Sequence, residues 1–316
     1  MVIPKAPPAP AAAGTGGMPR PRRSRRRTRS PLAAYGFLTP ALGLFLILVG
    51  IPMLGAFALV FLDYRIIGQP RFIGLDNLRR FFDDPMVPQV FGNTLKMLLP
   101  LVAAHCILGL GLAYATFRVA ARTASIYRAI IYFPTIVTTV SVAVAWGFML
   151  DTDNGVVNYY LAKLGAPHIP WLVSPTWSIP AIIVFSVWKF VGTPYLFFLI
   201  GLQNIPHSYL EAADVDGANA WQRFRYIILP LLTPTTFLVV VLSFINYLQL
   251  FDEPFVLTDG GPGTSSTSVT MYIYQNFEAG RYGYASTISA VLFVCILAIT
   301  LVQFLASKRW VRYDNE

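Results

Sequence analysis

Side chains that could perform acid–base or metal chemistry are few in this chain and lie far apart. Two acidic pairs, Asp151 with Asp153 and Asp252 with Glu253, stand at the ends of long apolar runs. We expect these carboxylates to meet water there rather than to share a proton. The other candidates show neither metal-ligand spacing nor a disulfide framework; they are His105, His168, His207, Cys106 and Cys295. The sequence therefore predicts no catalytic site, metal site or cofactor in this chain.

A nucleotide-binding loop is also missing from the sequence. Its pattern, Gly-x-x-x-x-Gly-Lys-Ser/Thr, presents backbone amides and a lysine to phosphate groups, and no segment of the chain matches it. The glycine-rich segment 260–263 (GGPG) lacks the lysine and is typical of a turn. The chain is therefore not expected to hydrolyse ATP itself.

Three polar side chains recur every three residues in the apolar run between Arg225 and Asp252; they are Ser243, Asn246 and Gln249. In a helix this spacing places them on one face. Polar groups within a membrane avoid lipid, so this face either makes hydrogen bonds between helices or lines a pathway for a hydroxyl-rich substrate. Both interpretations fit these residues.

A single charge, Lys189, stands inside the apolar run 179–202. A charge near the middle of a bilayer is costly and is usually paired or facing water, although a long lysine stem can also reach the interface. We favour a structural role within the helix bundle over contact with a substrate.

Composition indicates the elements that hold these residues. The chain of 316 residues is 55% hydrophobic and only 12% charged, whereas soluble domains carry about 25% charged residues. Uncharged runs long enough to cross a bilayer, which takes about 20 helical residues, predict an all-α integral membrane protein with six transmembrane helices. The expected spans are about 33–62, 94–117, 129–150, 179–202, 229–251 and 284–307.

The distribution of basic residues predicts the orientation. Residues 1–30 hold Lys5 and seven arginines without an acid, and are expected to form a disordered cytoplasmic tail. Six spans then put both termini in the cytoplasm, with the loop at 203–230 on the same side. One loop disagrees, because residues 63–92 carry four arginines and four aspartates; we interpret it as a folded extracytoplasmic segment.

A polar segment, Glu211 to Pro230, lies between two apolar runs and within the predicted cytoplasmic loop. We call this segment the polar island. Ser208 stands three residues before Glu211, the spacing in which a serine hydroxyl and a glutamate carboxylate cap the start of a helix. A helix is therefore predicted to begin near Tyr209.

The second half of the polar island carries signals for a turn and another helix. Gly217, after Asp216, can adopt the left-handed conformation that ends a helix. Asn219 followed by Gln222 forms a second capping pair. The predicted order is a helix, a glycine elbow and a second helix, with Pro230 leading into the next apolar segment.

The polar island resembles the signature of a known family. Glu-Ala-Ala, three residues, Gly217, nine residues and then Ile-Ile-Leu-Pro at 227–230 is similar to the EAA signature of the membrane-spanning subunits of bacterial ABC importers. The flanking segments GLQNIP (201–206) and FDEPFVLTDGGPG (251–263) resemble the carbohydrate-uptake branch related to the maltose and glycerol-3-phosphate permeases. The segment FIGLDNLRRFF (72–82) is similar to the amphipathic segment that family members place between their first two spans.

The resemblance implies a multi-pass permease subunit of the bacterial plasma membrane that forms half of a pathway for a sugar or oligosaccharide. Its implied partners are a second permease subunit, two cytoplasmic ATP-binding subunits that use ATP and magnesium, an extracytoplasmic substrate-binding protein and membrane lipid. ATP-driven closure of the two ATP-binding subunits would act on the coupling loop 203–230. The residues expected to couple to the ATPase are Glu211, Ala212, Ala213, Asp214, Asp216 and Gly217.

Individual roles follow from this resemblance. Glu211 is expected to cap its helix and to meet a cation of the ATPase, and Ala212 and Ala213 to leave room for close docking. Carbohydrate permeases line their path partly with the fifth span, which favours the pathway interpretation of its polar face. The expected pathway residues are Ser243, Asn246 and Gln249, together with Trp188 and Tyr195, whose rings could stack on a sugar.

Three alternatives stay open at this point. The same architecture could import glycerol-3-phosphate or another polyol. A polytopic membrane enzyme would need convergent catalytic groups, which the sequence does not offer. A membrane scaffold could use the arginine-rich tail to bind nucleic acid, but basic charge directly before a first span is expected from topology alone, so no nucleic-acid partner is predicted.

Overall fold

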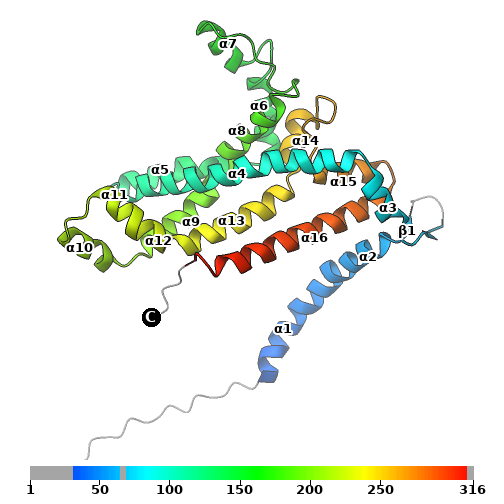
Figure 1. The fold of residues 1–316 in the computed structure, drawn as a ribbon, viewed down its shortest axis with the longest axis horizontal. Helices are drawn as coiled ribbons and strands as arrows, with labels where there is room; N and C mark the ends of the chain where they lie inside the picture. Colours follow the sequence, from blue (N-terminus) through cyan, green and yellow to red (C-terminus); the bar gives the residue numbers. More distant parts are fainter. Residues whose placement is uncertain (1–30, 65–68, 312–316) are drawn as a thin grey trace, which may run out of the picture. The chain divides into compact units, whose positions relative to one another are not determined.

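The computed structural model describes residues 31–64 and 69–311, which fold almost entirely as helices (Figure 1). The predicted tail, residues 1–30, lies outside the described residues. The chain has two compact units that divide between Pro52 and Met53. The helices are α1 (Pro31–Phe45), α2 (Ile51–Leu59), α3 (Asp76–Asp83), α4 (Met86–Phe117), α5 (Ala121–Ile136), α6 (Thr139–Met149), α7 (Val156–Lys163), α8 (Ser178–Phe190), α9 (Gly192–Gln203), α10 (His207–Val215), α11 (Ala220–Arg223), α12 (Leu229–Leu231), α13 (Thr233–Leu248), α14 (Asp252–Thr258), α15 (Val269–Glu278) and α16 (Tyr282–Ser307).

Candidate membrane spans come from both straight and bent helices. Three unbroken helical stretches are long and apolar enough to cross a bilayer: Leu38–Leu59, α4 and α16. Three further candidates are helix pairs that bend at a short break, by 94° between α5 and α6, by 45° between α8 and α9, and by 62° between α12 and α13. The described chain therefore has three spans, or up to six if each bent pair counts as one.

The sharpest break interrupts the run that the sequence analysis treats as one span, 129–150. Val137 and Thr138 between α5 and α6 have extended backbone, with ψ of 148° and 136°. Pro134 removes one helical amide donor, and the residues from Thr135 to Val140 are all β-branched, which lowers helix propensity. These residues explain why the helix ends here instead of continuing straight.

Two π-helical turns each precede a proline by two residues. The turn η1 (Leu46–Gly50) comes before Pro52, and η2 (Phe224–Ile228) comes before Pro230. A proline has no amide hydrogen and its ring collides with the carbonyl four residues earlier. Widening the preceding turn accommodates both effects without ending the helix.

The core of residues 53–311 is built around α4, which packs against α8, α9 and α13. Gly109 allows the closest approach, because a Cβ atom there would lie 3.0 Å from the Cβ of Pro194 on α9. One apolar cluster joins α4 to α8, α13 and α16, and a second joins α4 to α9 and the polar island. This packing fixes α9 and α13 beside each other.

A short segment before α4 closes one end of this bundle. The strands β1 (Leu62–Asp63) and β2 (Arg71–Phe72) pair antiparallel, and α3 buries Asn77 and Phe81 against the bundle. The Asn77 amide donates to the carbonyls of Val60 and Leu62, at 3.0 and 3.1 Å. The amphipathic segment that the resemblance implied at 72–82 is thus present as a folded element.

Asp84 links this end segment to α15 and α16. One carboxylate oxygen accepts hydrogen bonds from the hydroxyls of Tyr272 and Tyr284, each at 2.5 Å, and the other accepts from the amide of Met86 at 2.9 Å. Burial opposes the charge on Asp84, but these hydrogen bonds and the nearby Arg80 outweigh it and hold its pKa below the usual value. In Figure 1 this end lies opposite the end that carries α10 and α11.

Candidate functional site

The helix that leads into the polar island starts two residues earlier than predicted. Helix α10 runs from His207, with Pro206 as its N-cap residue and no side-chain cap. The predicted capping pair of Ser208 and Glu211 is therefore wrong, and Glu211 does not cap its helix. Pro206, with φ of −59°, turns the backbone into the helix, so Ser208 already lies inside the first turn and Glu211 beyond it.

The predicted glycine elbow is confirmed. Gly217 has φ of +72°, in the left-handed region. Its amide donates to the carbonyl of Asp214 at 3.2 Å, and the amide of Ala218 donates to that of Ala213 at 2.9 Å. These two bonds form a Schellman motif, which satisfies carbonyls at the end of α10.

The second predicted cap is also confirmed. The Asn219 side chain accepts from the amide of Gln222 at 2.9 Å, and the Gln222 side chain accepts from the amide of Asn219 at 2.8 Å. An ion pair between Arg223 and Asp214 connects the two helices across the elbow. The polar island is thus a stiff helix–elbow–helix unit.

This cap leads to a first prediction. Replacing Asn219 by alanine removes the acceptor of the Gln222 amide, which costs about 1 kcal/mol at a helix start. Amides in α11 should then exchange with deuterated water about fivefold faster, and Asn219→Asp, which keeps the acceptor, should behave like the parent chain. Equal exchange in the parent and Asn219→Ala would show that the cap does not hold α11.

Exposure separates the predicted coupling residues into two groups. Glu211, Ala212, Asp214, Asp216 and Gly217 are exposed. Ala213 is buried in the single chain but lines the groove beside the elbow, so its expected role in leaving room for docking stays a prediction.

Large side chains that the sequence analysis missed lie exposed on the polar island. Val215 is 88% exposed and Trp221 is 67% exposed, and Tyr226 is exposed as well. A groove of about 550 Å³ lies beside the elbow, lined partly by Ala212, Gly217 and Tyr226. A valine and a tryptophan within a polar stretch were the available signal, because apolar side chains gathered on a polar surface can mark an interaction site.

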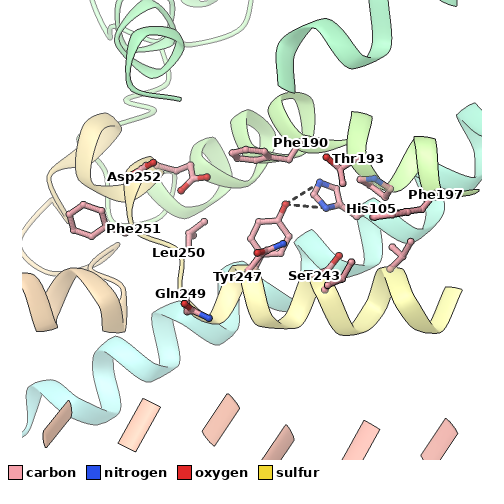
Figure 2. Close-up of a pocket in the computed structure, with 15 residues that line it drawn as sticks. His105, Phe190, Thr193, Phe197, Ser243, Tyr247, Gln249, Leu250, Phe251 and Asp252 are labelled. Atoms are coloured by element: carbon pink, nitrogen blue, oxygen red, sulfur yellow. Dashed lines mark hydrogen bonds between the residues drawn. The ribbon is translucent and has the colours of Figure 1, made fainter. Parts of the chain in front are cut away.

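A second site is a pocket of about 460 Å³ between α4, α8, α9, α13 and α14 (Figure 2). All three residues of the predicted polar face of α13 line it: Ser243, Asn246 and Gln249. Ser243 is buried, whereas Asn246 and Gln249 are exposed in this single chain. The structure thus brings these three predicted pathway residues together.

Other lining residues were not predicted. His105 from α4 contacts Tyr247 from α13, with the tyrosine hydroxyl 3.0 Å from Nδ1 (Figure 2). Thr193 and Phe197 of α9 contribute a hydroxyl and a ring. The sequence signal for His105 was a lone histidine in an apolar run, which does not by itself reveal that it faces a pocket.

The two aromatic residues predicted to stack on a substrate lie elsewhere. Tyr195 is 0% exposed, and its hydroxyl is 3.1 Å from the hydroxyl of Thr116. Trp188 packs on Trp146, with ring centroids 5.3 Å apart. Neither residue lines the pocket. Burial in the core corrects the prediction for Tyr195, whereas Trp188 is 41% exposed and its stacking on a substrate stays a prediction.

Lys189 connects the breaks in the two bent helix pairs. Its ammonium donates to the carbonyls of Pro134, Thr135 and Val137, at 2.6, 3.2 and 2.7 Å. In return, the hydroxyl of Thr135 donates to the carbonyl of Lys189 at 3.0 Å. Since helix ends leave carbonyls without intrahelical partners, Lys189 satisfies those at the end of α5, and the structural role expected for it is confirmed.

The acidic pair at the start of α14 differs from its prediction. Asp252 is exposed, but Glu253 is only 5% exposed and lines the pocket, so Glu253 does not simply meet water. Burial raises the pKa of Glu253 to about 7, with Asp252 acting in the same direction and Lys189 opposing it. Helix α14 packs against α6 and α8, which encloses this side chain.

The first acidic pair and the glycine-rich segment 260–263 lie in turns. Asp151 accepts the amides of Asp153 and Asn154 in an exposed turn, and Gly260 and Gly263 have positive φ in the predicted turn. Within the described ranges, no three His, Cys, Asp or Glu side chains come together to hold a metal ion.

Known proteins are similar to this chain over most of its length. The family described as "binding-protein-dependent transport system inner membrane component" matches residues 85–311. The chain belongs to this family. The permease is 36% identical over 303 residues to YesP, a probable ABC transporter permease protein of Bacillus subtilis, covering 93% of this chain and 96% of YesP.

Two further matches extend over most of the permease. MalF, the trehalose/maltose transport system permease protein of Thermococcus litoralis, is 33% identical over 281 residues, covering 88% of this chain and 95% of MalF. A solved bacterial ABC transporter involved in the import of the acidic polysaccharide alginate contains a chain with a TM-score of 0.78 at 27% identity, covering 89% and 96% of the two chains.

These matches confirm the resemblance and the all-helical membrane fold. The chain is a permease subunit of a binding-protein-dependent ABC importer and a multi-pass inner-membrane component. Its family consists of transport components, which removes the membrane-enzyme alternative.

Proposed function

We propose that this permease forms one half of a carbohydrate pathway and that an ATP-binding subunit docks on its polar island. The observation that carries the pathway proposal is the pocket on α13, where hydroxyl, amide and aromatic groups converge between candidate spans. Such groups suit a sugar, which offers many hydrogen-bonding hydroxyls and an apolar ring face. The names of MalF and of the alginate transporter, both concerned with carbohydrates, support this assignment.

A second permease subunit is needed to complete the pathway. Asn246 lies in a candidate span and Gln249 directly follows its last residue, Leu248, yet both are exposed in the single chain. Polar side chains within a membrane face protein or water rather than lipid. A similar subunit packed over α13 would enclose these amides and leave a polar channel between the two chains.

The polar island supports docking of a cytoplasmic motor. Its second helix is capped, its elbow is fixed by two hydrogen bonds, and it exposes Val215 and Trp221 beside a groove. A stiff unit transmits force better than a loose loop. The proposed orientation puts the island and both termini in the cytoplasm, following the positive-inside rule, with the substrate-binding protein acting at the opposite end.

Replacing Asn246 and Gln249 by leucine tests the pathway. The complex reconstituted with its second permease, ATP-binding subunits and substrate-binding protein should still assemble, but its sugar uptake should fall about 30-fold, since two hydrogen-bonding groups worth about 1 kcal/mol each are lost. Ile245→Leu, on the same helix but outside the pocket, is the matched control. Unchanged uptake, affinity and substrate range in the double variant would mean that these amides are structural.

A further inference from the structure

The end of the pocket nearest α14 is acidic. Asp252 and Glu253 line it, and none of the described residues that line the pocket is a lysine or arginine. Asp252 stands in the first turn of α14, where an acid also stabilises a helix start. Glu253 stands in the same first turn, but its side chain is buried and borders the pocket, so it does not meet water at the helix start as Asp252 does.

Glu253 lacks a hydrogen-bond donor from its neighbours. Lys189 is close enough for the two charges to interact, but its three ammonium hydrogens match the three carbonyls that it already contacts. The Tyr247 hydroxyl contacts His105. Within the described chain, the Glu253 carboxylate therefore accepts only from its own backbone amide. A buried carboxylate in this position is costly unless a ligand or water supplies donors.

An aromatic surface lies beside this carboxylate. Phe251 lines the same pocket, and its ring stacks on that of Phe255 with centroids 5.1 Å apart and planes 16° apart. Tyr274 packs edge-on against both rings. A carboxylate that accepts hydrogen bonds, together with an aromatic ring held in place by its neighbours, suits a ligand that has both hydroxyl or amino donors and an apolar face.

We propose that Glu253, with Asp252, selects neutral or amino sugars and disfavours phosphorylated, sulfonated or carboxylated ones in this half of the pathway. This inference rests on the proposed function of the pocket and deepens it. Hydroxyl or ammonium groups would supply the missing donors to Glu253. An anionic substrate would bring a like charge next to a buried carboxylate, which weakens its passage. Glycerol-3-phosphate is accordingly disfavoured as a substrate.

Charged thiol reagents measure this selectivity without knowledge of the substrate. In the assembled importer, Asn246→Cys is introduced after Cys106 and Cys295 are replaced by serine. The rate at which this cysteine is modified is measured with a cationic and with an anionic methanethiosulfonate. Each rate is divided by the rate of the same reagent with a small free thiol in solution, and the two normalised rates are compared. The cationic reagent should react about 100-fold faster, since the carboxylates that line the same pocket attract a cation and repel an anion. Glu253→Gln should reduce the ratio at least tenfold.

The matched control is Glu278→Gln, an exposed acid on α15 that contacts Tyr274 rather than the pocket; it should leave the ratio unchanged. Equal rates for the two reagents, or a ratio unaffected by Glu253→Gln, would overturn the selectivity inference while leaving the pathway intact. A thiol at position 246 that reacts with neither reagent in an importing complex would instead contradict both the pathway assignment and the inference.

Discussion

Gly217→Val is expected to abolish uptake and to detach the ATP-binding subunit while membrane insertion continues. Gly217 has φ of +72°, and a Cβ atom there would meet nothing within 4 Å. The effect therefore comes from the backbone, because a β-branched residue held in this conformation costs about 1–3 kcal/mol. To relieve the strain, the elbow must open and separate α10 from α11, which removes the groove beside it.

The chain offers a matched control for this substitution. Gly280 has φ of +71°, also has open space around it, and ends α15 with the same pair of hydrogen bonds. Gly280→Val should impose a similar strain at the opposite end of the bundle and leave the ATP-binding subunit attached. Gly217→Asn, which tolerates the left-handed region, should keep most of the uptake. Full uptake with Gly217→Val would refute the coupling role of the elbow.

Lys189→Met is expected to prevent stable assembly of the importer. The substitution keeps an unbranched side chain but leaves the carbonyls of Pro134, Thr135 and Val137 without their donor. Each buried polar group left unpaired costs about 1–3 kcal/mol, a large share of the stability of a typical protein. The breaks at α5–α6 and α8–α9 should then lose their fixed positions.

Thermal unfolding of the detergent-solubilised complex and uptake in vesicles measure this effect together. Both should fall strongly, uptake by more than tenfold. Lys189→Arg should restore little, because a planar guanidinium cannot place its donors at the same three carbonyls as a compact ammonium. Lys163→Met, at an exposed lysine of α7, is the control. Normal stability of Lys189→Met would show that these carbonyls find other donors.

Local signals predicted the elements that depend on neighbouring residues. Uncharged runs located the apolar helices, Gly217 located the elbow and Asn219 located the cap, because each of these acts within a few residues. The same reasoning failed at Ser208, where Pro206 starts the helix earlier. The spacing of Ser208 and Glu211 did not reveal that the fixed φ of Pro206 leads the backbone into the helix first.

Features that depend on distant parts of the chain could not be predicted in this way. The break between α5 and α6 is stabilised by Lys189, more than fifty residues later. Glu253 looked like a charge at a span end, but α14 folds back on α6 and α8 and buries it. Tyr195 was predicted to stack on a substrate, but it is buried and its hydroxyl contacts Thr116 of α4. In each case tertiary packing decides the role of the side chain.

The most direct test of the proposed coupling is whether the polar island contacts the ATP-binding subunit. In a transport-competent importer with Cys106 and Cys295 replaced by serine, Ala212→Cys should crosslink to the ATP-binding subunit, and the yield should change with ATP. A membrane-impermeant thiol reagent should reach this position only from the cytoplasmic side. An importing complex that shows no such crosslink, or labelling of this position from outside, would contradict the proposed coupling.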